Sequence, residues 1–144
     1  MIHSSLFSSL LAFATILNAS PARGDAVITC RRAALEIAGA WTNDGFRLRE
    51  RPWAGILPAG KPALARVNLI AGNRYWFSAA TNAASTFISV NIYTEHGTPV
   101  TAETYQDGPL AAAGFAPSQS GLYLIAVSES HGTPVPFCLV YSYK

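Results

Sequence analysis

Apolar residues recur along the first part of the chain at helical spacing. Over 27–42 they form a single stripe, and the charged residues Arg31, Arg32 and Glu36 lie off it. The stripe consists of Val27, Cys30, Ala34, Ile37, Ala38 and Trp41. Asn43 and Gly45 follow, and both residue types adopt the left-handed conformation that ends helices. The pattern therefore predicts one helix over 27–42, with the stripe as its buried face.

The remainder of the chain has the pattern of a β protein. Short apolar runs rich in β-branched and aromatic residues alternate with turn residues. The runs cover 63–70, 74–80, 87–93, 98–105, 110–115, 122–128 and 135–143, and an alternating run at 46–51 precedes them across a turn-rich segment. Strands this close together, without helices between them, favour an antiparallel β-sandwich, jelly-roll-like, over a parallel α/β sheet.

The alternating run carries a row of arginines. Arg47, Arg49 and Arg51 take every second position, so on a strand they project from one face while Leu48 faces inward. Trp53 follows in a loop rich in Pro and Gly. An aromatic ring beside several guanidinium groups suits an acidic glycan, a lipid head group or an acidic protein, so Arg47, Arg49, Arg51 and Trp53 form the candidate ligand-binding site. The alternative is a solvated face with Trp53 folded over its loop.

Composition and charge narrow the function classes. Half of the 144 residues are hydrophobic and 12% are charged, which supports one well-packed domain and does not suit a disordered tail or a nucleic-acid-binding arm. The net charge of +2 is unevenly distributed. Residues 27–74 carry eight basic and three acidic side chains, whereas residues 75–144 carry one basic and four acidic side chains. This polarity can orient the protein at an anionic surface.

Residues 1–26 have the pattern of a secretory signal peptide. An apolar core over 6–17 is too short to span a bilayer, and small residues then offer cleavage after Ala22 or after Ala26. A retained apolar anchor is the alternative, because His3 and the α-amino group are the only basic groups before the core. No later run reaches the ~20 apolar residues of a membrane-spanning helix. We expect a single domain over 27–144 that is secreted or periplasmic and has no membrane span.

Two cysteines, Cys30 and Cys138, lie near the two ends of this domain. In an exported protein we expect one disulfide between them. The bridge would tie the buried face of the helix to the last strand and close a loop of almost the whole domain. The alternative is lipidation of Cys30, although residues 27–29 lack the Leu and small-residue pattern that lipidation normally requires.

Candidate catalytic chemistry is sparse. The sequence His-Gly-Thr-Pro-Val occurs at 96–100 and again at 131–135. Two turns of one design explain the repeat, with Gly at positive φ and Pro at the start of a strand. The alternative is a metal site on His96 and His131, with Glu95 and Glu129 nearby in sequence and a third ligand assumed. The sequence contains no nucleophile elbow, paired carboxylates, calcium loop or phosphate loop, so we assign no catalytic residue, metal or cofactor.

Short motifs in the second half are shared with a known family. They are Leu-Ile-Ala-Gly and Tyr-Trp-Phe within 69–77, Ile-Tyr and Glu-His-Gly within 92–97, and Phe-Ala-Pro and Ser-Gly-Leu-Tyr within 115–123. On these motifs the segment 69–143 resembles the bacterial pre-peptidase C-terminal domain, a β-sandwich often attached to secreted enzymes. This chain departs from the family pattern in having a helix where a catalytic domain would precede the module. The resemblance implies a jelly-roll-like sandwich with a non-catalytic accessory or binding role.

Together these observations predict an exported, non-catalytic binding module whose partner is an unknown protein or glycan. Two alternatives remain open. One is a small hydrolase or metal-dependent enzyme that uses His96 and His131. The other is a structural subunit whose exposed sheet edge pairs with a partner.

Overall fold

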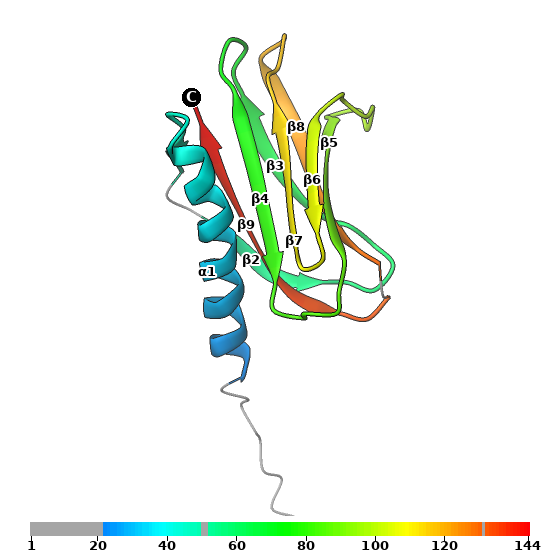
Figure 1. The fold of residues 1–144 in the computed structure, drawn as a ribbon. Coiled ribbons are helices and arrows are strands. Elements are labelled where there is room, and N and C mark those ends of the chain that lie inside the picture. Colours follow the sequence, from blue (N-terminus) through cyan, green and yellow to red (C-terminus); the bar gives the residue numbers. More distant parts are fainter. Residues whose placement is uncertain (1–21, 50–51, 131) are drawn as a thin grey trace, which may run out of the picture.

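The computed structural model describes residues 22–49, 52–130 and 132–144. In that part of the chain it has one helix and two antiparallel sheets (Figure 1). The elements are α1 (Ala22–Thr42), β1 (Arg47–Leu48), β2 (Trp53–Leu57), β3 (Ala63–Leu69), β4 (Tyr75–Thr81), β5 (Ile88–Thr94), β6 (Glu103–Asp107), β7 (Leu110–Phe115), β8 (Gly121–Glu129) and β9 (Val135–Tyr143). One sheet has the order β1-β9-β4-β7-β6, with β2 also paired to β9, and the other has the order β3-β8-β5. The predicted class, an antiparallel β-sandwich with one N-terminal helix, is confirmed.

The main core lies between the two sheets. Strand β3 shows how the sequence builds it, because Ala65, Val67 and Leu69 are buried while the residues between them are exposed. The opposite sheet supplies large side chains such as Phe77 and Leu139, which are also buried. Removing this apolar surface from water is the main stabilising term for the sandwich.

The helix α1 packs on the outer face of the larger sheet, along β9 and β4 (Figure 1). Cys30, Ala34 and Ala38 point toward the sheet at a spacing of four residues and are buried, as the sequence predicts. The sheet meets them with Ala80, Cys138 and Val140. Since most of these side chains are small, the helix can approach the sheet closely. The molecule therefore has three layers, in the order helix, larger sheet and smaller sheet.

In the described residues the helix already includes Ala22, so it extends beyond the predicted start at Val27. The prediction started at the first residue of the apolar stripe, whereas Asp25 in the first turn favours an earlier start through its interaction with the helix dipole. The helix ends at Thr42 as predicted, and Gly45 closes it with a φ of 88°. No helix in the described part of the chain is long and apolar enough to cross a membrane. The predicted signal peptide falls mostly on residues 1–21, outside the described residues.

Two tryptophans fix the C-terminal end of α1 to the sheet. The rings of Trp41 and Trp76 stack with centroids 3.9 Å apart and an interplanar angle of 7°. The indole nitrogen of Trp41 also donates a hydrogen bond of 3.2 Å to Ser78 Oγ. Gly114 on β7 leaves room for Trp76, because a Cβ at this position would lie 2.7 Å from the indole carbon Cζ2. A glycine is therefore required here by close packing rather than by its backbone angles.

Some predicted strand boundaries are wrong. Within the described part of the run at 46–51, which is 46–49, the only strand is the two-residue β1. Strand β2 lies in the segment predicted to be a loop. Strand β2 forms because the long strand β9 offers it backbone hydrogen-bond partners. The two strands pair antiparallel, from Trp53 opposite Leu139 to Leu57 opposite Val135. The run at 98–105 becomes a strand only from Glu103, because residues 98–100 bond to the edge of β5 instead.

Candidate ligand-binding groove

A groove of about 1020 Å³ opens along one side of the sandwich. One wall is the segment around β1 and β2 at the end of the larger sheet, and the other wall is β3, which is the first strand of the smaller sheet. The larger sheet contributes Arg49, Trp53, Tyr141 and Tyr143, and β3 contributes Arg66, Val67 and Asn68. We call this feature the edge groove.

The floor of the edge groove is aromatic. Trp53 and Tyr141 stack with ring centroids 5.5 Å apart and an interplanar angle of 24°. Their backbones explain the contact, because β2 pairs Trp53 with Leu139, and Tyr141 follows two residues later on the same face of β9. Phe77 supports Tyr141 from below at 5.4 Å. The rings are therefore held in place by the core before any ligand binds.

Two guanidinium groups line the groove. Arg49 lies over the ring of Tyr141 at 5.8 Å, and its backbone N–H donates a hydrogen bond of 2.9 Å to the Tyr141 carbonyl. Arg66 projects from an exposed position of β3 on the opposite wall. None of the described residues that line the groove is acidic. Arg49 and Arg66 give the groove a positive charge, which attracts anions.

The groove also affects the ionisation of Tyr141. Burial raises the pKa of its hydroxyl above the usual value of 10.0, and the nearby Arg49 guanidinium partly offsets this rise. At neutral pH the phenol is therefore protonated and can act as a hydrogen-bond donor to a ligand.

Half of the predicted site is brought together by the fold. Arg49 and Trp53 both line the edge groove. Arg47 is exposed but lies on β1 outside the residues that line it, and Arg51 lies outside the described residues. The expectation that Leu48 faces inward is wrong, since 42% of this residue is exposed. Strand β1 ends at Leu48, so Arg49 lies outside it and strict alternation does not extend to Arg49.

Sequence reasoning missed Arg66. The alternation of buried and exposed residues along β3 marks Arg66 as exposed, but the same holds for Leu64 and Asn68. What gives Arg66 its place in the groove is the position of β3 beside the β1–β2 segment. That neighbour relation joins two different sheets and leaves no local pattern in the sequence.

The fold brings Cys30 and Cys138 together at the contact between α1 and β9. Both are fully buried, and their Sγ atoms are 3.2 Å apart. A disulfide has a sulfur–sulfur bond of about 2.05 Å, so the structure holds two free thiols in contact and the predicted bond is absent from it. Burial, with a further contribution from the Cys30 thiol, raises the pKa of Cys138 from 9.0 to about 12. At neutral pH this thiol is protonated and unreactive.

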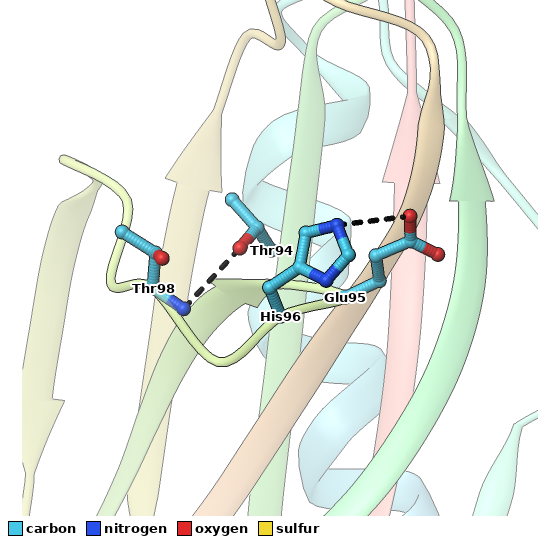
Figure 2. Close-up of polar contacts among 4 residues, drawn as sticks. All are labelled: Thr94, Glu95, His96 and Thr98. Carbon is cyan, nitrogen blue, oxygen red and sulfur yellow. Dashed lines mark hydrogen bonds and ion pairs between the residues drawn. The ribbon is translucent and has the colours of Figure 1, made fainter.

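The region of His96 is a turn. The backbone N–H of Thr98 donates to Thr94 Oγ1 at 3.2 Å, while the exposed His96 side chain lies 3.5 Å from Glu95 (Figure 2). Gly97 has a φ of 82°, and Gly132 in the second copy of the repeat has a φ of 71°, so both glycines have the predicted positive φ. His131 lies outside the described residues. Among the described residues no three His, Cys, Asp or Glu side chains gather in a group that could hold a metal ion.

Comparisons with known proteins do not assign the chain to a family. No family model matches it, and no curated protein is significantly similar to it. The resemblance to the pre-peptidase C-terminal domain therefore stays a prediction, and the edge groove is the feature on which a functional proposal can be built.

Proposed function

We propose that this chain is an exported, non-catalytic binding module whose edge groove holds an acidic glycan. The observation that carries the proposal is the arrangement of two arginines, Arg49 and Arg66, on either side of the stacked pair Trp53 and Tyr141. Arginine matches the geometry of a carboxylate with two parallel hydrogen bonds, and an apolar aromatic floor with a few polar groups is typical of ligand sites.

A sugar chain fits this groove better than a membrane surface does. Trp53 is only partly exposed and Tyr141 is 8% exposed, because both rings lie between the two sheets. A flat surface does not reach a recessed floor, whereas a single chain of sugar rings does. Carboxylates on that chain would then meet Arg49 on one wall and Arg66 on the other.

The binding proposal is tested with polygalacturonate and with the same polymer after full methyl esterification, which removes its charge. We expect binding to the charged form only, with a dissociation constant that rises about tenfold in Arg66→Gln. Lys61→Gln is the matched control, since Lys61 is also exposed but lies outside the groove lining. Unchanged binding in Arg66→Gln, or equal binding of both polymers, contradicts the site. Binding of poly-L-glutamate alone would instead assign the groove to an acidic protein.

Export is proposed from the apolar segment 6–17, and its test is the N-terminal sequence of secreted material. We expect cleavage after Ala22, because a cut after Ala26 removes more than one full turn of α1. That turn includes Asp25, whose carbonyl accepts a hydrogen bond of 2.8 Å from the Thr29 hydroxyl. A mature chain that begins at Met1 contradicts export.

In the exported protein we further propose that Cys30 and Cys138 become a disulfide. Their sulfurs are already in contact at 3.2 Å, so a small local shift is enough to form the bond. The two thiols would lose two protons and two electrons to the disulfide of an oxidoreductase, which is reduced to a dithiol.

A further inference from the structure

The edges of the two sheets are protected unequally. An open strand edge invites pairing with another chain, and natural proteins block it with charges, short strands or covering segments. Strand β6 is exposed at all five positions and carries Glu103 and Asp107. The edge of β5 is covered, because Val100 N–H donates to the Ile92 carbonyl at 3.1 Å and Thr94 N–H donates to the Thr98 carbonyl at 2.9 Å. The edge strands β1 and β2 are short.

In the described part of the chain strand β3 is neither short nor covered, and the one charged residue on it is Arg66. The strand is seven residues long, and β8 is its only strand partner there. Two large apolar residues lie at the ends of its exposed face, with Leu64 58% exposed and Ile70, directly after the strand, 59% exposed. Arg66 and Asn68 lie between them. An uncovered edge of this length, with exposed apolar residues at both ends, indicates an interaction surface.

We propose that two copies of this chain pair antiparallel through β3, about a two-fold axis at Val67. In this register Leu64 lies opposite Ile70 of the second copy, and Arg66 lies opposite Asn68 of the second copy. The same apolar pair therefore forms twice, once on each side of the axis. The inward-facing residues also match, with Ala65 opposite Leu69 and Val67 opposite Val67.

The sequence of β3 selects this register over its neighbours. An axis at Arg66 places Arg66 opposite Arg66 and Leu64 opposite Asn68, which sets like charges side by side and leaves Leu64 without an apolar partner. An axis between two residues turns the second sheet over, so that exposed residues of one copy continue the buried face of the other. Only the axis at Val67 keeps both faces continuous and also places Leu64 opposite Ile70.

The evidence for pairing does not depend on the proposed glycan, but the two surfaces share one wall of the edge groove. The shared residues are Arg66, Val67, Asn68 and Ile70. Leu64 belongs to the β3 edge and does not line the edge groove, whereas Trp53 lines the groove and lies on the other sheet. The variants Leu64→Lys and Trp53→Ala therefore separate the two proposals. If Leu64→Lys loses the dimer and still binds the glycan, the result supports the pairing through β3 and leaves the groove proposal unaffected.

Sedimentation velocity of the purified chain, from micromolar to about 1 mM, tests the association. We expect a monomer–dimer equilibrium whose dissociation constant rises about tenfold or more in Leu64→Lys, because a charge then lies opposite Ile70. Ile28→Lys is the matched control, since Ile28 on α1 is 57% exposed and lies away from β3. A monomer at every concentration overturns the proposal, as does a dimer that Leu64→Lys leaves intact.

Cross-linking reports the register directly. Opposed residues of an antiparallel pair have Cα atoms about 4.5–5.5 Å apart, which a disulfide can span. A mixture of Arg66→Cys and Asn68→Cys chains should form a cross-linked dimer on mild oxidation, identified by mass spectrometry after proteolysis. Arg66→Cys alone should not. Cross-linking of Arg66→Cys with itself, at an efficiency equal to or above that of the mixture, overturns the register.

Discussion

Oxidation of the buried cysteine pair should stabilise the protein strongly. The bond would join α1 to β9 across 108 positions of sequence, and both sulfurs are completely buried. A cross-link of this kind acts mainly on the unfolded chain, because it removes conformations that the open chain can adopt. The relevant comparison is therefore between the same sequence with the bond formed and with two thiols.

The size of the effect follows from the length of the closed loop. The chain-entropy relation gives about 4.7 kcal/mol for a loop of roughly one hundred residues. The unfolding entropy of a domain of about 120 residues, at about 2.1 cal/mol/K per residue, converts this to a rise in Tm of roughly 19 °C. Part of the gain is lost because the sulfurs, now 3.2 Å apart, must approach by about 1 Å. We expect a rise between roughly 10 and 19 °C.

The assay is thermal unfolding followed by circular dichroism. One sample is refolded in a glutathione redox buffer and its bond verified by non-reducing mass spectrometry, and the other is kept in reductant. Cys138→Ala is the control, because its melting temperature should be the same in both buffers. A verified bond that moves the Tm by less than about 2 °C would refute the loop argument, since the chain-entropy term would then be absent.

Two further predictions concern packing and ionisation. Gly114→Ala should destabilise the fold by about 1–3 kcal/mol in chemical denaturation, because the new Cβ would lie 2.7 Å from the Trp76 ring. Gly121→Ala is the control and should change stability by less than about 1 kcal/mol, because the space around its Cβ is open. Equal effects of the two substitutions would contradict the packing argument. Arg49→Gln should raise the pKa of Tyr141 further, since it removes the cation that lowers this pKa, and NMR of tyrosines labelled at Cζ measures the change. Because the folded pKa is above the unfolded value, this tyrosine stabilises the fold below pH 10.0, and that stabilisation is lost as the pH rises through the folded pKa. An unchanged or lower pKa in Arg49→Gln contradicts the contact.

Local periodicity was sufficient to predict the helix and its buried face. Cys30, Ala34 and Ala38 recur every four residues, and this spacing by itself places them on one side of a helix. The contact of Cys30 with Cys138 also followed, once both were assigned to buried faces of the first and last elements. The N-terminal extent of α1 could not be predicted in this way. Its first turn is stabilised by the helix dipole and carries no apolar stripe.

Strand β2 and the place of Arg66 in the groove depend on tertiary pairing, which the sequence pattern does not reveal. Strand β2 contains Gly55 and is flanked by Pro52 and Pro58, a composition that indicates a loop. It is a strand because β9 provides its hydrogen-bond partners, and because the side chain of Phe137 covers Gly55, with a ring carbon 3.4 Å from the position of a Cβ. Arg49 and Trp53 are close in sequence, so they could be proposed as a site without the structure. Arg66 belongs to that site only because the fold places β3 beside them.

The contact of the first element with the last has a consequence for how the chain is made. The surface on which α1 packs is formed by β9 and β4, and the chain closes when Lys144 donates a hydrogen bond of 2.7 Å from Nζ to the Asp44 carbonyl. During synthesis or translocation the helix emerges first and must wait, with its apolar stripe uncovered, until the final strand arrives. Any oxidant must also act in that interval, because afterwards neither sulfur can be reached. The packing of α1 is thus completed only after β9 has emerged.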